Sequence, residues 1–394
     1  MASKHAAARA TPVYDDPVTD VTALFDWLLD GAPGAASSVD VADRLGNELS
    51  AAGIPIQRLA VFVTTLHPNV LGRSFIWERG QPTKLGTLSH EVRASSSFRD
   101  SPVTWCMTHA REWRWRAGEP DHGYSVIASL SARGCVDYVA LPMPFTNGEI
   151  HVLSLSSDVG FADDHLAAVR TILRPLTRLA EILALRRTAS NILSTYVGAS
   201  SGERVLAGRI FKGDVDIIRA AIWFSDLRGF TELSSRRAPR EMIAVLNDVF
   251  ECQVPAIEQH GGEVLKFIGD GLLAIFPITE AAPAGSRCRA ALDAAGATFA
   301  ALDALNSRTG QELRIGLALH VGDVAYGNIG GASRLDFTAI GAAVNLAARL
   351  EGIASKLGRQ MVVSAAFAEL SGRAFEDLGP FDLKGIGEPQ HVFG

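Results

Sequence analysis

Two aspartates stand where apolar segments of the chain run into glycine-containing turns. Asp226 ends the apolar stretch of residues 221–225, and Asp270 lies in a Gly-Asp-Gly turn 44 residues later. A carboxylate at a strand end is held by a rigid element yet open to a ligand, and Mg²⁺ and Mn²⁺ prefer such oxygens. Two aspartates of this kind can hold a pair of ions for phosphoryl chemistry. Taken singly, each is also explained as a turn residue that hydrogen-bonds the local backbone.

A third segment adds groups suited to phosphate. Residues 336–351 (DFTAIGAAVNLAARLE) place a glycine-containing turn before a helix. Asn345 and Arg349 are four residues apart and therefore share one helix face. Arginine offers a planar, charged fork for phosphate oxygens, and asparagine can orient a sugar or a phosphate. The alternative interpretation is a solvated arginine and a helix-capping asparagine, because exposed polar faces are common.

Together these segments resemble the catalytic domain of the class III nucleotidyl cyclases, the adenylyl and guanylyl cyclases. The resemblance covers roughly residues 204–394. Its motifs stand in the family's order: residues 224–231 (FSDLRGFT), 260–263 (HGGE), 266–270 (KFIGD) and 383–389 (LKGIGEP). Several separated motifs in one order make the match specific.

The resemblance implies a role for each matched position and two Mg²⁺ or Mn²⁺ ions per active site. The positions form three groups: metal ligands (Asp226, Asp270 and the Leu227 carbonyl), purine-selecting residues (Lys266 and Thr338), and residues that contact the ribose and phosphates (Asn345, Arg349 and Lys384). Every expected catalytic position is filled.

The purine-selecting pair favours ATP. A lysine donor suits an acceptor ring nitrogen of adenine, and a threonine hydroxyl can accept from its exocyclic amine, whereas guanine would meet mismatched partners. Guanylyl cyclases of this family usually present glutamate and a small residue such as cysteine. Thr338 departs from the aspartate of many adenylyl cyclases, and this variant is associated in the family with bicarbonate-responsive enzymes.

The predicted function is therefore that of an adenylate cyclase, which converts ATP to 3′,5′-cyclic AMP and pyrophosphate by two-metal catalysis. In the family one domain of a dimer supplies the metal aspartates and the other supplies the purine-selecting, asparagine and arginine positions, so we expect a homodimer. A guanylate cyclase is the first alternative, and a catalytically silent module for dimerisation or nucleotide sensing is the second. A diguanylate cyclase would need a GG[DE]EF-type hairpin, which residues 268–271 (IGDG) are not.

Apolar patterns predict an α/β (α+β) palm for this domain. We expect strands at residues 219–225 and 313–320, a hairpin of residues 263–268 and 272–276, and helices at residues 239–259 and 286–305. The first helix has Ile243, Leu246, Val249 and Phe250 on its apolar side, and Pro255 should kink or end it. Strands interleaved with helices favour a two-layer sheet of the ferredoxin-like kind.

The length of 394 residues predicts two domains. We expect a disordered lead over residues 1–20, a sensor domain with a long exit helix over 21–190, a transducing linker over 191–213 and the cyclase domain over 214–394. The first domain resembles a GAF-type small-molecule sensor, because a helix precedes strand pairs at residues 59–66 with 73–77 and 136–142 with 149–155, and a long helix follows residue 164. Its ligand or protein signal is unknown.

Two features of the first domain have alternative explanations. Aromatic and sulfur residues cluster in sequence, so a haem or aromatic-ligand pocket with an axial His109 or Cys106 competes with simple core packing by Trp105, Trp113 and Trp115. Apolar residues also recur every three or four positions along the exit helix, at Leu166, Val169, Leu173, Leu176, Ala180 and Leu183. This pattern fits a dimer seam or a helix packed on its own sheet, and Pro175 weakens the coiled-coil interpretation.

Composition excludes several classes of protein. A net charge of -6 and a pI near 5.9 provide no basic surface for nucleic acid. Four cysteines without paired spacing indicate a reducing compartment, so we expect a cytoplasmic protein. The chain has no apolar run of about 18 residues, which predicts no membrane span.

Overall fold

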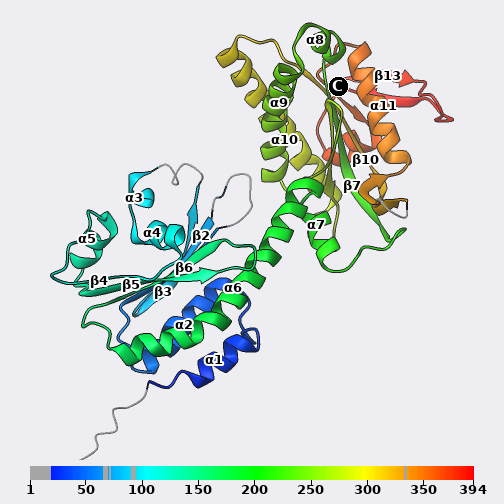
Figure 1. Ribbon diagram of the computed structural model, residues 1–394. Helices are drawn as coiled ribbons and strands as arrows, with labels where there is room; N and C mark the ends of the chain where they lie inside the picture. The colour runs from blue at the N-terminus through cyan, green and yellow to red at the C-terminus, as the bar shows by residue number, and fades with distance from the viewer. Residues whose placement is uncertain (1–18, 65–69, 71, 90–94, 332–334) are drawn as a thin grey trace, which may run out of the picture. The chain divides into compact units, whose positions relative to one another are not determined.

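The computed structural model describes residues 19–64, 70, 72–89, 95–331 and 335–394. The chain divides into two compact units, Met1–Ile192 and Leu193–Gly394, and each unit has its own sheet (Figure 1). Residues 1–18 of the predicted lead over residues 1–20 lie outside the described residues, as do the last two residues of the predicted strand over 59–66.

The first unit is built on a six-stranded sheet with the order β3-β2-β1-β6-β5-β4, in which every neighbouring pair is antiparallel. The strands are β1 Arg58–Thr64, β2 Gly72–Glu78, β3 Gln81–Leu88, β4 Trp113–Arg116, β5 Asp137–Pro144 and β6 Ile150–Ser157. The helices are α1 Thr22–Leu29, α2 Ser38–Ala51, α3 Ser96–Arg99, α4 Pro102–His109, α5 Ser125–Ser131 and α6 Asp163–Val197. Both predicted strand pairs and the long exit helix are confirmed, whereas β3 and β4 were not predicted.

Both faces of this sheet are covered, because strand residues alternate between its two sides. In β5, Val139 and Leu141 join the core formed with α1, α2 and α6, whereas Tyr138 and Ala140 join the core formed with α4 and α5. Figure 1 shows α2 and α6 together on one side of the sheet and α3 and α4 on the other. The larger core is the one under α6.

The apolar stripe of α6, which fits either a dimer seam or a helix packed on its own sheet, packs on its own sheet. Leu166, Val169 and Leu176 are 0–2% exposed within the core of the first sheet. Leu173, Ala180 and Leu183 are partly buried against the same core. The helix also continues through Pro175 for 35 residues in all. A stripe with three- and four-residue spacing serves an intramolecular sheet as well as a partner helix, and here the sheet covers it.

The cluster of tryptophan, cysteine and histidine residues in the first unit contributes to core packing, with Cys106 and Trp115 in one buried cluster. Cys106 is fully buried, its thiol lies 3.8 Å from the Ala140 carbonyl, and burial raises the pKa of this thiol to about 12. His109 is exposed, with its ring stacked on Trp105 at a centroid distance of 4.4 Å. Because its buried thiol stays protonated, Cys106 acts as a core residue and not as a haem ligand, whereas an axial role for His109 stays a prediction.

The second unit has an eight-stranded sheet with the order β13-β14-β12-β10-β7-β9-β8, and β11 pairs with β10. The strands are β7 Val215–Leu227, β8 Glu263–Ile268, β9 Gly271–Pro277, β10 Ile315–Gly330, β11 Leu335–Ile340, β12 Met361–Ser364, β13 Asp377–Phe381 and β14 Gln390–Phe393. The helices are α7 Ala199–Leu206, α8 Phe230–Arg236, α9 Pro239–Gln259, α10 Ala284–Thr309, α11 Ala342–Lys356 and α12 Ala365–Ser371.

The run β7-α9-β8-β9-α10-β10 is the predicted ferredoxin-like unit, since β9 lies between β7 and β8 and all its strand pairs are antiparallel. The prediction of two layers was wrong. On β7, Ala221 and Trp223 pack toward α10, whereas Ala220 and Ile222 pack toward Ala343 of α11 on the opposite face. Helices therefore cover both faces of this sheet.

Helix α9 differs from its prediction in two details. Ile243 is 58% exposed, because the buried stripe runs one position away, through Met242, Val245 and Val249. Pro255 does not end the helix, which continues to Gln259. A proline removes one backbone donor, and the packing of a buried helix outweighs that loss here.

The segment predicted as a linker contains the end of α6 and helix α7, which packs on the second unit. The Ser201 hydroxyl lies 2.6 Å from the Tyr326 hydroxyl, which donates a hydrogen bond to Glu263 at 2.9 Å. The Arg204 guanidinium lies over the Tyr326 ring and pairs with Asp216. These contacts fasten α7 to strands β7, β8 and β10, and a transducing role for the segment stays a prediction.

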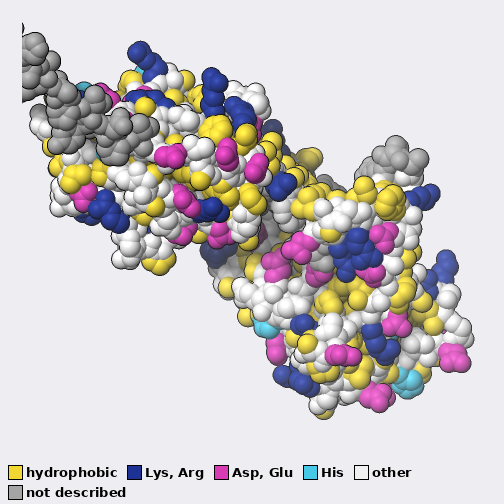
Figure 2. Space-filling model, turned by 90° about the horizontal axis from the view of Figure 1, so that it is seen from below, with side chains coloured by type: hydrophobic (Ala, Val, Ile, Leu, Met, Phe, Trp, Pro, Cys, Tyr) yellow, Lys and Arg dark blue, Asp and Glu magenta, His cyan; other side chains and the backbone are white. Residues whose placement is uncertain are grey.

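The surface carries charges of both signs. On the face in Figure 2, lysine and arginine side chains lie among aspartate and glutamate side chains. That face therefore has no continuous basic patch of the kind that binds nucleic acid. Within the described part of the chain, every helix is too short or too polar to cross a membrane.

Candidate active site

The two predicted metal aspartates lie together at one end of the second sheet. Asp226 is the next-to-last residue of β7, and Asp270 lies in the two-residue turn between Ile268 and Gly271 that joins β8 to β9. Because β9 pairs directly with β7, the turn is brought beside the end of β7. The predicted hairpin and the predicted strand end are both confirmed.

A glycine permits this close approach. A side-chain carbon at Gly271 would lie 2.9 Å from the Ser225 carbonyl oxygen and 3.3 Å from an Asp226 carboxylate oxygen. Any larger residue would push the turn away from β7. The glycine therefore sets the spacing of the two aspartates.

The side chains of Asp226 and Asp270 interact directly. Burial raises the pKa of Asp226 to about 7, with further contributions from a hydrogen bond to Asp270, from the charge of Asp270 and from that of Glu351. The Leu227 amide donates a hydrogen bond to the Asp226 carboxylate, and this hydrogen bond lowers the pKa of Asp226. Two carboxyl groups within hydrogen-bonding reach of each other resist ionising together unless a cation lies between them.

This pair fits a divalent cation. Hard carboxylate oxygens are the protein ligands that Mg²⁺ and Mn²⁺ take, and the remaining positions are commonly filled by water and substrate phosphates. Among the described residues, no cluster of three or more histidine, cysteine, aspartate or glutamate side chains is arranged to hold a metal. A two-carboxylate site completed by phosphates is thus the arrangement that these residues allow. The Leu227 carbonyl stays a predicted ligand.

An ion pair that the sequence analysis missed lies beside the aspartates. The Arg228 guanidinium lies 2.7 Å from the carboxylate of Glu351 on α11, and the two side chains are 23% and 9% exposed. Burial raises the pKa of Glu351, and the charge of Arg228 opposes this shift. Arg228 follows the metal-motif residues directly, but no spacing in the sequence links it to a partner 123 positions away.

The predicted purine-selecting residues lie on two strands, β8 and β11, that are not paired with each other in the sheet. Lys266 of β8 forms an ion pair with Asp336 of β11, two residues before Thr338. Thr338 pairs across the ladder with Gly327 and is half-buried. The Lys266 ammonium group therefore lies at the strand that carries Thr338. The pairing of Asp336 with Lys266 was not predicted.

The phosphate-contact residues form a separate group on α11 and the loop after β13. Asn345 is exposed and Arg349 half-buried, four residues apart on α11 as predicted. A side-chain carbon at Gly385 would lie 3.4 Å from an Arg349 guanidinium nitrogen. Arg349 is thus close to the backbone beside Lys384, whose side chain is exposed.

These three groups remain distinct within one chain. No hydrogen bond or ion pair among the described residues joins Asp226 or Asp270 to the purine-selecting or phosphate-contact groups. The three groups suit three different partners. The aspartates suit metal cations, the side chains of Lys266 and Thr338 suit a base, and the positive charges of Arg349 and Lys384 suit phosphates. A nucleoside triphosphate with bound divalent ions has all three kinds of partner.

Comparison with known proteins agrees with this chemistry. Residues 216–393 match the model of the adenylate and guanylate cyclase catalytic domain. An adenylate cyclase of Anabaena cylindrica is 36% identical over 154 residues, which cover 37% of this chain and 29% of the relative. Adenylate cyclase 1 of Rhizobium meliloti is 33% identical over 149 residues, which cover 36% and 22%. The match thus spans less than a third of either curated relative.

Among solved structures, the adenylyl cyclase CyaB from P. aeruginosa is 26% identical, with a TM-score of 0.42, and covers 45% of this chain and 94% of that chain. The family match and the motifs it contains together support a class III adenylyl/guanylyl cyclase catalytic domain at residues 216–393.

Proposed function

We propose that this protein is an adenylate cyclase that converts ATP to 3′,5′-cyclic AMP and pyrophosphate. The observation that carries the proposal is the direct interaction of Asp226 with Asp270, which places two carboxyl groups side by side at the end of β7. A domain that served only for dimerisation would have no need for two adjacent carboxylates at a strand end. The curated relatives named adenylate cyclase support the same class of reaction.

In this proposal each group of residues acts on one part of ATP. Asp226 and Asp270 hold divalent ions, which supply activation of the ribose 3′-hydroxyl and neutralisation of the leaving pyrophosphate. Arg349 donates hydrogen bonds to the phosphoryl oxygens, where negative charge grows in the transition state. Asn345 orients the ribose, and Lys384 holds the triphosphate.

Adenine is the proposed base. Lys266 would donate to a ring nitrogen and Thr338 would accept from the exocyclic amine. The ion pair between Lys266 and Asp336 supports this reading, since it holds the Lys266 ammonium beside the strand of Thr338. A guanylate cyclase is the alternative, because the matched family includes both activities and guanylate cyclase 2G of Mus musculus is 26% identical over 245 residues.

We further propose that the working site lies between two copies of the chain. Arg349 and Glu351 are two residues apart on α11 and point in roughly opposite directions, because each residue turns a helix by about 100°. Glu351 faces Arg228 and the aspartates of its own chain. The Arg349 face therefore points away from that aspartate pair, and a second chain would supply the missing half.

The first unit would be the regulatory part. Its order of a helix, a sheet and a long exit helix supports the GAF-like sensor interpretation. Helix α6 leaves this unit and continues across the division at Ile192 into the second unit. A change at the sensor could thus reach the catalytic unit through a continuous helix.

Incubation of the purified chain with Mn²⁺ and either ATP or GTP tests the proposed function. The cyclic products are separated by chromatography, with the Asp226→Ala variant as the control for contaminating activity. We expect cyclic AMP from ATP and little product from GTP. Preference for GTP would assign a guanylate cyclase, and no cyclic product from either nucleotide would contradict the enzyme assignment.

A further inference from the structure

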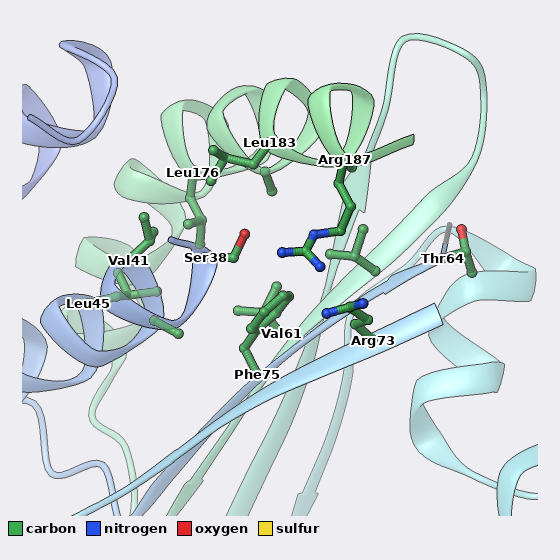
Figure 3. A pocket seen from close by; sticks show the side chains of 14 residues that line it. Ser38, Val41, Leu45, Val61, Thr64, Arg73, Phe75, Leu176, Leu183 and Arg187 are labelled. Atoms are coloured by element: carbon green, nitrogen blue, oxygen red, sulfur yellow. The ribbon is translucent and has the colours of Figure 1, made fainter. Parts of the chain in front are cut away.

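The first unit has a cavity between helices α2 and α6 and strands β1 and β2 (Figure 3). The space that the centres of water-sized groups can occupy measures about 50 Å³, and the whole hollow, including the part open to solvent, about 620 Å³. It has room for several water molecules or for organic groups of similar size. Cores are normally packed without such voids, so this space needs an explanation.

The walls of the cavity are largely apolar. Val41 and Leu45 come from α2, Val61 and Phe75 from β1 and β2, and Leu176 and Leu183 from α6. Figure 3 shows these side chains surrounding one end of the space. Water gains few hydrogen bonds from such walls, whereas a hydrocarbon group is stabilised by them.

Two arginines close the other end. Arg73 of β2 and Arg187 of α6 both extend their guanidinium groups into the cavity (Figure 3). Burial, and then the charge of Arg187, lowers the pKa of Arg73. Neither side chain has a carboxylate partner among the described residues, and the buried Nε of Arg73 has no hydrogen-bond partner there. Arg73 is half-buried and Arg187 is exposed, so the donor that the described residues leave unsatisfied is the buried Nε of Arg73. An anion beside the two guanidinium groups would accept a hydrogen bond from it.

We propose that this cavity binds an organic monoanion, a carboxylate with an apolar hydrocarbon body. The carboxylate would accept hydrogen bonds from Arg73 and Arg187, and the hydrocarbon would lie between Leu45, Phe75 and Leu176. The anion removes the repulsion between the arginines and satisfies the buried donor. The apolar body fills space that the core leaves empty.

This inference rests on the proposed function, because it names the ligand class of the proposed sensor. Arg187 and Leu183 belong to α6, the helix that continues into the second unit. A bound carboxylate would tie this part of α6 to β2 through both arginines. The position of α6 would then differ between the free and bound states, and the catalytic unit would respond.

Calorimetric titration of the full chain, without nucleotide, tests the site. The probes are octanoate, 1-octanol, which has the same hydrocarbon length without the charge, and acetate, which has the charge without the hydrocarbon. We expect octanoate to bind at least about tenfold more tightly than either, because hydrogen bonds to a charged group and hydrocarbon burial each contribute about that factor or more. Equal binding of octanoate and 1-octanol would contradict a role for the arginines, and no octanoate binding would contradict the site.

A matched pair of variants locates the binding. Arg187→Gln should weaken octanoate binding about tenfold or more, whereas Arg186→Gln, at a neighbouring position that is also exposed but does not line the cavity, should leave it unchanged. Arg73→Gln should act like Arg187→Gln, with circular dichroism as the control for folding. Equal losses from Arg186→Gln and Arg187→Gln would place octanoate elsewhere.

This test is separable from the test of the cyclase. Octanoate binding is measured without turnover, so an inactive second unit would leave it in place and would overturn only the proposed reaction. If octanoate binds to wild type but the rate of cyclic AMP formation is the same with and without it, the sensor role of the cavity is wrong while the catalytic assignment stands.

Discussion

The Arg228 guanidinium lies 2.7 Å from the Glu351 carboxylate, and this ion pair joins helix α11 to the strand end that carries Asp226. Both side chains are largely removed from water, at 23% and 9% exposed. Breaking such a pair leaves a buried charge without a partner, which costs more than the pair itself contributes. The pair also fixes the helix from which Asn345 and Arg349 project.

Replacing Glu351 by a neutral residue should therefore destabilise the second unit. We expect Glu351→Gln to lower its stability by about 2–3 kcal/mol, and to lower the Tm of its transition in scanning calorimetry by about 5 °C or more. The control is Glu232→Gln, which breaks the exposed pair of Glu232 with Arg236 at 67% and 75% exposure. That change should cost about 0–1 kcal/mol. Equal effects of the two variants would show that Arg228 does not depend on Glu351.

A second variant breaks the same pair without changing its charges. A side-chain carbon at Gly316 would come within 2.0 Å of an Arg228 nitrogen and 2.3 Å of a Glu351 oxygen. Gly316→Ala should thus separate the two groups and reproduce most of the loss in Tm. A stable Gly316→Ala protein would mean that the ion pair can rearrange freely.

Loss of either aspartate should abolish most of the activity. We expect Asp226→Ala and Asp270→Ala each to lower turnover by about three orders of magnitude or more, since alanine offers no oxygen to a cation. Asp248→Ala, at an exposed position of α9, is the matched control and should be close to wild type. Circular dichroism checks that each variant is folded. Near-normal turnover by either variant would remove that aspartate from the site.

The raised pKa of Asp226 predicts a link between pH, metal and stability. Its pKa of about 7 lies above the ordinary value of 3.8, so without metal the folded chain retains a proton that the unfolded chain has lost. The contribution of this group to stability is present at low pH and is lost as the pH rises from about 4 to 7. The metal-free Tm of wild type, measured relative to Asp226→Asn, should therefore fall over that range.

Mn²⁺ competes with this proton. The increase in Tm that Mn²⁺ produces should be larger at pH 8 than at pH 6, because the carboxylate is then ionised before the cation binds. Asp226→Asn should show little increase at either pH. An increase in Tm that is independent of pH would mean that Asp226 is ionised throughout.

The sequence predicted the parts of this site that depend on local pattern. An apolar strand that ends at Asp226, and a glycine turn around Asp270, determine their own geometry. Pairing between distant charges leaves no local pattern, and for this reason the partners of Arg228 and Lys266 were missed. The two arginines of the cavity, Arg73 and Arg187, are likewise brought together only by the packing of α6 on β2.

The exit helix shows the limit of pattern reasoning more directly. Its spacing predicted an apolar stripe correctly but could not identify the surface that covers it. Leu166 and Val169 are buried by the unit's own sheet. Ile182 and Leu185, outside the predicted seam, are 47% and 62% exposed. Of the two alternatives that the spacing left open, the structure thus favours the helix packed on its own sheet, and any pairing of α6 with a second copy would use another face.

Purine selectivity should depend on Lys266 and Thr338. In the double variant Lys266→Glu with Thr338→Cys, the ratio of kcat/KM for ATP to that for GTP should fall about a hundredfold or more, because the donors and acceptors offered to adenine are then reversed. Lys212→Glu, a charge reversal at an exposed position, is the control. A ratio that does not change would place the base elsewhere.

The division of the site between two chains can be tested by mixing inactive variants. If one chain supplies the aspartates and the other supplies Arg349, a heterodimer of Asp226→Ala with Arg349→Ala has one intact site and one doubly damaged site. With full exchange of subunits, half of the dimers are heterodimers, so about one quarter of wild-type activity should return. Mixing Asp226→Ala with Asp270→Ala is the control and should stay inactive, since both variants damage the same half of the site. A tagged pull-down verifies exchange, and an inactive first mixture in which exchange has occurred would rule out the shared site.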